Sequence, residues 1–106
     1  AVCSDISNYM LERARDKADQ QGYGVDRIDF RQLDAESLPF EDASFDAAMT
    51  GMTLGLLPDQ DKAIREMVRV LRPGGFLSAG AHGPEHYWEA CDASFKSINK
   101  RYVLGY

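Results

Sequence analysis

The feature that most restricts the fold is a repeated alternation of short apolar runs with amphipathic helical patterns. The segments with strand character are 1–4, 26–33, 45–53 and 76–81. The segments with helical character are 8–20, 58–71 and 85–99. Strands that alternate with helices predict an α/β protein, here with a mostly parallel sheet of about four strands and helices on both faces. The ligands of such sheets gather at the carboxyl ends of the strands.

Two of the helical segments have well-marked ends. In the first, Ser7 can cap the N-terminus, and Gly22 and Gly24 follow the last turn. Its apolar residues recur at helical spacing and are Met10, Leu11, Ala14 and Ala18. The second segment opens at Pro58-Asp59 and has the strongest periodicity, in Ala63, Ile64, Met67, Val68 and Leu71. We predict that it stops at Arg72-Pro73-Gly74-Gly75, because proline and glycine break helices.

Composition limits the class of protein. With 106 residues, 44% of them apolar and 27% charged, the chain has the make-up of one globular domain, so we expect a single domain over residues 1–106. A net charge of −5 argues against nucleic acid as the main partner. The sequence has neither a long apolar run nor a leader pattern, so we expect no membrane partner. Cys3 and Cys91 lack disulfide or metal spacing, which predicts free thiols and a cytoplasmic location.

Two acidic residues that follow strands are candidate ligands of a nucleoside. Asp5 stands between a strand and a helix cap, where its carboxylate can accept both hydroxyls of a ribose or simply complement the helix N-terminus. Asp34 can accept an exocyclic purine amine, while the backbone N–H of Ala35 donates to a ring nitrogen. Asp34 can equally bond its own turn. When each acid is considered alone, the sequence favours the structural role, at the helix N-terminus for Asp5 and in its own turn for Asp34.

An apolar plug, Leu38-Pro39-Phe40, interrupts the acidic loop that follows Asp34. The plug can wall an adenine or make a small hydrophobic contact under the loop, and the sequence favours neither. We interpret the neighbouring acids Glu36, Glu41 and Asp42 as solvated. Further on, Thr50-Gly51 closes an apolar strand, where glycine permits close approach by a ligand or an ordinary turn.

The two histidines do not define a metal site. His82 and His86 flank Gly83-Pro84, which prevents one continuous helical turn, and no third ligand is evident. We therefore expect no metal. His82 follows a strand and is a candidate general base, but the pattern assigns no catalytic residue.

Three segments, taken in order, resemble class I S-adenosylmethionine-dependent methyltransferases of the small-molecule type. They are SDISNYMLERAR (4–15), LDAESLPFEDASFDAAM (33–49) and EMVRVLRPGGFL (66–77). Together they extend over roughly residues 1–82. The resemblance implies a partial Rossmann-like methyltransferase fold, enzymatic activity, S-adenosylmethionine as cofactor and a small-molecule methyl acceptor.

The resemblance also implies a role for each candidate residue. Asp5 would take the ribose hydroxyls of the cofactor, with Ile6 beside the adenine. Asp34 would take the adenine amine, with the backbone of Ala35 reading the ring. Thr50 and Gly51 would lie next to the methionine part. Methyl transfer then requires mainly positioning and the exclusion of water.

The chain departs from the family pattern at three places. The family's first strand with its glycine-rich loop, and its last two strands, have no counterpart in these 106 residues. A histidine pair common after the fourth strand is replaced by Gly55-Leu56. In the family's strand order, 3-2-1-4-5-7-6, the first strand is central. We therefore expect either that the strands on its two sides pair directly or that a second copy fills the gap, in a homodimer or by domain swapping.

The sequence thus predicts methyl transfer from S-adenosylmethionine to a small molecule, with this chain a truncated domain that binds the cofactor weakly. The alternative is a non-catalytic α/β interaction or dimerising module that retains the fold without a complete cofactor site. A dehydrogenase fits less well, because Gly22-Tyr23-Gly24 follows a helix and lacks the third glycine of a dinucleotide fingerprint. Residues 82–95 are the part expected to contact the methyl acceptor, whose identity the sequence does not give.

Overall fold

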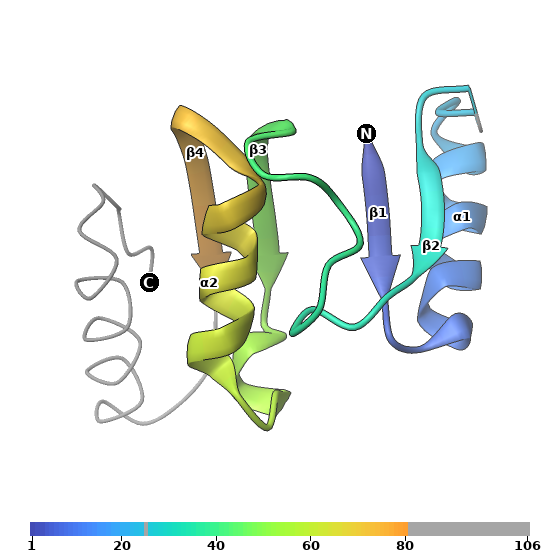
Figure 1. Ribbon diagram of the computed structural model, residues 1–106. Coiled ribbons are helices and arrows are strands. Elements are labelled where there is room, and N and C mark those ends of the chain that lie inside the picture. The colour runs from blue at the N-terminus through green and yellow to red at the C-terminus, as the bar shows by residue number, and fades with distance from the viewer. Residues whose placement is uncertain (25, 81–106) are drawn as a thin grey trace. The chain divides into compact units, whose positions relative to one another are not determined.

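In the computed structural model, the described residues are 1–24 and 26–80, and they contain four strands and two α-helices (Figure 1). Backbone contacts divide the chain into a first unit, Ala1–Ala35, and a second unit that begins at Glu36. Both strand pairs in the described residues are parallel, which confirms the α/β class. A single domain over 1–106 stays a prediction. The helix predicted over 85–99, together with His82, His86 and Cys91, lies outside the described residues.

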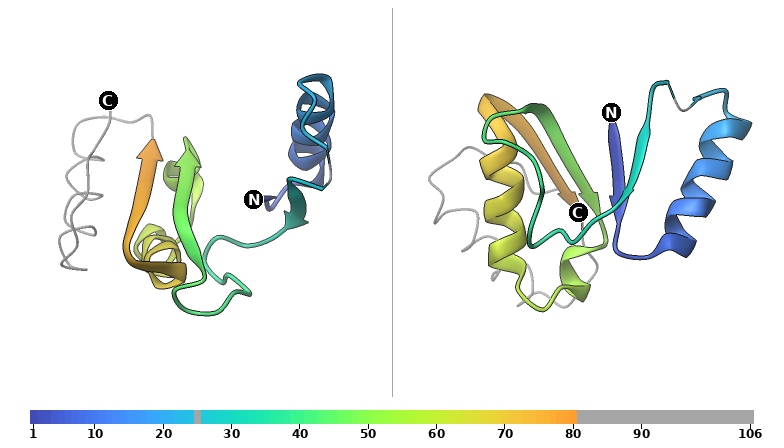
Figure 2. Two further views of the ribbon diagram at one scale, coloured as in Figure 1. Left: turned by 90° about the horizontal axis from the view of Figure 1, so that it is seen from above. Right: turned by 45° about the vertical axis from the view of Figure 1, so that its right-hand side comes forward.

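The first unit consists of β1 (Val2–Asp5), α1 (Asn8–Gln20) and β2 (Asp29–Gln32). The strands pair in parallel, and α1 connects them while packing against both (Figures 1 and 2). The predicted helix and its cap are confirmed, because the Ser7 Oγ accepts a hydrogen bond from the Met10 N–H at 3.4 Å. Leu11 and Ala18 are buried, but Met10 is 50% exposed. The apolar stripe of α1 is therefore covered at Leu11 and Ala18 and exposed at Met10.

Strand β2 is shorter than the predicted segment 26–33. A turn holds the residues before it, with the Arg27 N–H donating to the Gly24 carbonyl at 3.0 Å. The ladder to β1 starts only at Asp29, whose N–H donates to the Ala1 carbonyl at 2.8 Å. The partner strand therefore decides where β2 begins.

The second unit contains β3 (Phe45–Gly51), the 3-10 helix η1 (Leu54–Leu56), α2 (Gln60–Val70) and β4 (Leu71–Gly80). Strands β3 and β4 pair in parallel, and α2 covers one face of the pair (Figures 1 and 2). The helix starts one residue after its cap Asp59, whose Oδ1 accepts from the Lys62 N–H at 3.0 Å. The predicted apolar stripe of α2 is confirmed. The buried core of this unit is Leu54, Ala63, Ile64, Met67, Val68, Val70 and Leu71.

The predicted helix stop at Arg72-Pro73-Gly74-Gly75 is confirmed, but these residues also lie within a strand. Helix α2 ends at Val70, and the chain turns into β4 at Leu71 without an intervening loop. The four residues form an irregularity inside β4, between the pairs Phe45–Leu71 and Ala47–Phe76. The predicted strand 76–81 therefore begins earlier. Residue 75 lies so close to neighbouring backbone that an added Cβ would come within 2.9 Å of the Arg72 carbonyl oxygen.

The four strands of residues 1–24 and 26–80 form two sheets of two strands each. In the described residues β1 is hydrogen-bonded only to β2 and β3 only to β4. How the gap left by the family's central strand is closed, by direct pairing or by a second copy, stays a prediction. In the sheet of β3 and β4, Ala47 is paired with Phe76, and Met49 lies two residues further along β3 on the same face. On this face Met49 is 79% exposed and Phe76 is 60% exposed.

Candidate functional site

The carboxyl ends of β1 and β2 bring the two predicted acids to the same edge of the first unit's sheet. Asp5 is the last residue of β1 and stands opposite Gln32, the last residue of β2. The Leu33 N–H donates to the Asp5 carbonyl at 3.1 Å, so the pairing extends to the residue directly before Asp34. Asp34 is exposed and Ala35 half-buried. Parallel pairing in this register therefore places both acids where α/β sheets bind ligands.

Asp5 has a structural bond in addition to its position at this edge. Its Oδ1 accepts a hydrogen bond from the Ser7 N–H at 2.8 Å, in the turn that leads into α1. This bond orients the carboxylate, and an ionised carboxylate has further acceptor sites for other donors. Ile6 is 66% exposed, and its carbonyl accepts from the Gln32 Nε2 at 2.9 Å, which ties the turn to β2. The edge thus combines oriented acceptors with an exposed apolar side chain.

Thr50 and Gly51 belong to the second unit and close β3. They pair with Ala79 and Gly80 of β4. The strand ends here rather than at the predicted Thr53, because Met52 takes a positive φ of 57° and the chain then enters η1. Gly51 is exposed, and an added Cβ would meet no atom within 4 Å. Of the predicted site residues, Asp5, Ile6, Asp34 and Ala35 thus share one unit, while Thr50 and Gly51 lie in the other.

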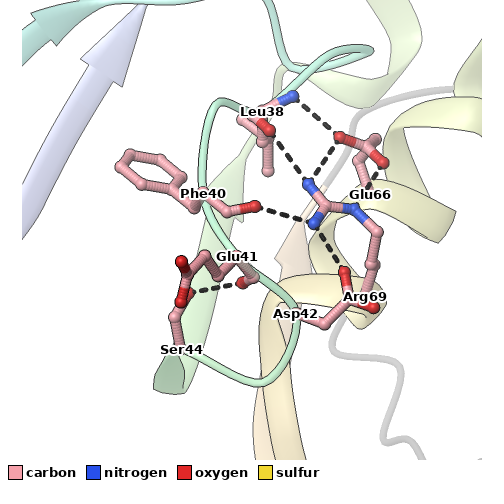
Figure 3. Close-up of polar contacts among 7 residues, drawn as sticks. All are labelled: Leu38, Phe40, Glu41, Asp42, Ser44, Glu66 and Arg69. Atoms are coloured by element: carbon pink, nitrogen blue, oxygen red, sulfur yellow. Dashed lines mark hydrogen bonds and ion pairs between the residues drawn. The ribbon is translucent and has the colours of Figure 1, made fainter.

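An ion-pair cluster that sequence analysis missed fastens the loop 38–43 to α2 (Figure 3). The Arg69 guanidinium donates to the carbonyls of Leu38 at 2.9 Å and Phe40 at 2.7 Å. It also donates to the Asp42 carboxylate at 2.8 Å. The Asp42 side chain is 81% exposed, in agreement with the prediction of a solvated acid, but it is also an ion-pair partner of Arg69. The signal in the sequence was the acid–base pair Glu66 and Arg69, three residues apart on one helix.

Glu66 completes this cluster. It accepts from the Arg69 Nε at 2.8 Å and, on its other oxygen, from the Leu38 N–H at 2.8 Å. The bond from Arg69, more than any other contact, lowers the pKa of Glu66 below its ordinary value. Conversely, the bonds to Glu66 and then Asp42 raise the pKa of Arg69. The Phe40 ring packs edge-on against Phe45 at 5.0 Å, so this part of the apolar plug makes the local hydrophobic contact.

The lowered pKa of Glu66 predicts acid sensitivity of the second unit. Because the folded-state pKa lies below the unfolded value of about 4.3, the stabilisation is present above that value and is lost as the pH falls through the lowered pKa. We expect the urea midpoint of wild type to decline more steeply below about pH 4.5 than that of Glu66→Gln. Parallel curves for the two proteins would contradict the assignment.

Other site types find little support in residues 1–24 and 26–80. No three histidine, cysteine or acidic side chains gather there in a way that could hold a metal ion. Within the same residues, no helix has the length and apolar character needed to cross a membrane. Cys3 is a half-buried free thiol, and burial, followed by the charge of Asp5, raises its pKa. The cytoplasmic location stays a prediction.

Parallel strands connected through helices, with acidic residues at the carboxyl edge, define an α/β protein of the Rossmann-like class. Residues 1–79 match the family model described as a methyltransferase domain. The chain belongs to this methyltransferase family.

Two curated relatives are ubiquinone/menaquinone biosynthesis C-methyltransferases UbiE. The protein from Hahella chejuensis is 49% identical over 76 residues, which cover 72% of this chain and 30% of the relative. The protein from Pseudoalteromonas translucida is 38% identical over 105 residues, covering 98% of this chain and 41% of the relative. The chain therefore spans less than half the length of these two proteins.

Solved structures agree with the fold. YcgJ from Bacillus subtilis has a TM-score of 0.70 and 31% identity, covering 92% of this chain and 41% of that protein. The (4+2)-cyclase SpnF has a TM-score of 0.67 and 40% identity, covering 74% of this chain and 28% of that protein. A methyltransferase from Aquifex aeolicus has a TM-score of 0.73, covering 94% of this chain and 58% of that protein, but at 19% identity this likeness shows the fold alone.

Proposed function

We propose that this chain is the adenosine-binding part of an S-adenosylmethionine-dependent methyltransferase that acts on a small-molecule acceptor. Asp5 would accept the ribose hydroxyls and Asp34 the exocyclic amine of adenine. Ile6 would lie beside the adenine, the backbone of Ala35 would read the ring, and Thr50-Gly51 would face the methionine part. The cofactor supplies a methyl group on a positively charged sulfur, and no residue of this chain is assigned to the transfer itself.

The observation that carries the proposal is the juxtaposition of Asp5 and Asp34 at one sheet edge. The register that pairs Asp5 with Gln32 brings the two acids to the ends of adjacent strands. Two carboxylates at neighbouring strand ends suit a ligand with vicinal hydroxyls and a ring amine, because each of these groups is a hydrogen-bond donor. The curated relatives are methyltransferases, which favours methyl transfer over the reaction of the related cyclase.

Removing either acid is expected to weaken nucleoside binding by about 1–3 kcal/mol, the cost of losing a hydrogen-bonded polar partner. NMR titration of the 106-residue chain detects even millimolar affinity. Asp5→Ala is expected to abolish the advantage of adenosine over adenine, because adenine lacks the ribose. Asp34→Ala is expected to reduce the preference for adenosine over inosine, because inosine lacks the exocyclic amine.

A matched control is Asp16→Ala, which removes an exposed acid from α1 in the same unit. It is expected to leave all of these preferences unchanged. If Asp5→Ala and Asp34→Ala change only the stability of the fold, the chain is instead the non-catalytic interaction module. Isothermal titration with S-adenosylmethionine adds a further test. We expect the 106-residue chain to bind this cofactor with a dissociation constant above the micromolar range.

We further propose that a second copy or another strand completes the sheet. Support comes from the two-stranded sheets themselves, since an isolated pair of strands is only marginally stable in water. Sedimentation equilibrium tests the homodimer: a mass of twice 11.8 kDa is expected, and a purely monomeric chain with cooperative unfolding would exclude the swapped form.

A further inference from the structure

The turn between β1 and α1 is held by a side chain of β2 as well as by backbone bonds. The parallel ladder ends at the pair Asp5–Gln32, and one further backbone bond joins the Leu33 N–H to the Asp5 carbonyl at 3.1 Å. The Gln32 Nε2 then donates to the carbonyl of Ile6 at 2.9 Å, across 26 residues of sequence. The glutamine side chain thus extends the bonding between the strands by one residue, at the edge where Asp5 ends β1.

These bonds fix the backbone on both sides of Ile6. The peptide group before Ile6 is bonded through the Asp5 carbonyl. The peptide group after it is bonded twice. Its carbonyl accepts from Gln32, and its N–H, which belongs to Ser7, donates to the Asp5 Oδ1 at 2.8 Å. The orientation of this backbone is therefore determined by hydrogen bonds to β2 and within the turn itself.

The side chain of Ile6, in contrast, is 66% exposed, so packing holds it only weakly. A single exposed apolar side chain is normal on a protein surface and indicates nothing alone. Here the side chain stands next to Asp5, at the carboxyl edge of the sheet, on backbone that is already ordered. A ligand that contacts Ile6 therefore binds without the cost of ordering the turn.

We infer that Gln32 is a positioning residue for nucleoside binding, which holds Ile6 in place to contact the base. This inference rests on the proposed function, in which Ile6 lies beside the adenine. All of the groups involved belong to the first unit, Ala1–Ala35. Without the bond from Gln32, the peptide group after Ile6 keeps only the bond from the Ser7 N–H. Binding must then order the turn again, which lowers the affinity.

Gln32→Leu tests this role in the 106-residue chain, because it keeps the approximate size of the side chain and removes both amide donors. We expect the adenosine affinity to fall about fivefold in an NMR titration, which corresponds to one hydrogen bond of ordinary net strength. Ile6→Ala is expected to weaken adenosine binding through loss of the apolar contact. The double variant Ile6→Ala with Gln32→Leu is expected to bind adenosine as Ile6→Ala does, because no side chain is left to position.

The matched control is Gln20→Leu, which makes the same substitution at an exposed glutamine, the last residue of α1 in the same unit. It is expected to bind adenosine as wild type does. Gln32→Glu is a second probe of the bond. A carboxylate of the same size has no N–H to donate at neutral pH, so this variant is expected to be as weak as Gln32→Leu. It takes the place of Gln32→Leu if that variant loses its helical circular dichroism.

The outcomes separate this inference from the proposed function. Equal adenosine affinity in Gln32→Leu and Gln20→Leu would overturn the positioning role, while the preferences lost in Asp5→Ala and Asp34→Ala would still support the nucleoside site. Losses that multiply in the double variant would also overturn it, because Gln32 would then act independently of Ile6. If wild type fails to bind adenosine, both proposals fall.

Discussion

Ile64→Ala is expected to lower the free energy of unfolding of the second unit by about 2–5 kcal/mol. Ile64 is 1% exposed, the most completely buried large side chain among the described residues, and lies in the middle of the buried stripe of α2. Truncation removes its transfer free energy and leaves a cavity between the helix and the strands that α2 covers. Domains of this size are stable by only about 5–15 kcal/mol, so the loss is a large share of the total.

Urea denaturation followed by far-ultraviolet circular dichroism measures this loss. The matched control is Leu56→Ala, which truncates an apolar side chain that is 84% exposed in the same unit. Surface substitutions of this kind stay within about 0.5 kcal/mol of wild type. If Ile64→Ala is unfolded without denaturant, Ile64→Val gives a measurable loss of about 0.5–1.5 kcal/mol. Equal losses at positions 64 and 56 would show that the core does not lie where the structure places it.

Gly75→Ala is expected to destabilise the β3–β4 pair by about 1–3 kcal/mol, the range for forcing extra volume into a packed site. The added Cβ would lie 2.9 Å from the Arg72 carbonyl oxygen and 3.1 Å from that of Asp46. Both contacts are with backbone, which cannot rotate away as a side chain can. Relief therefore requires a shift of the irregular segment of β4 or of its neighbour β3.

Gly51→Ala is the matched control, because an added Cβ there meets nothing within 4 Å. Its free energy of unfolding is expected to stay within about 0.5 kcal/mol of the wild-type value. Hydrogen exchange of the Ala47 and Phe76 amides localises the effect, since these residues face each other just beyond the irregularity. Similar stabilities for the two alanine variants would contradict the close backbone approach at residue 75.

The site was predictable to the extent that it depends on strand order. Asp5 and Asp34 could be assigned to one sheet edge because parallel neighbours present their carboxyl ends together. The role of Asp42 could not be assigned in this way. Its partner Arg69 lies 27 residues further along the chain, and the carbonyls of Phe40 and Leu38 reach the same side chain over 29 and 31 residues. No local pattern in a loop indicates such a contact.

The sequence by itself determined α1 and α2, their N-caps and the alternation of strand and helix in the described residues. These features depend on spacing within a few residues, as Ser7 and Asp59 at the two N-caps illustrate. Only the tertiary structure decided that Arg72-Pro73-Gly74-Gly75 lies within a strand and that the loop 38–43 is fixed to α2. The physical reason is that strand limits and loop positions depend on hydrogen bonds to partners far along the chain, which chain-local propensity does not encode.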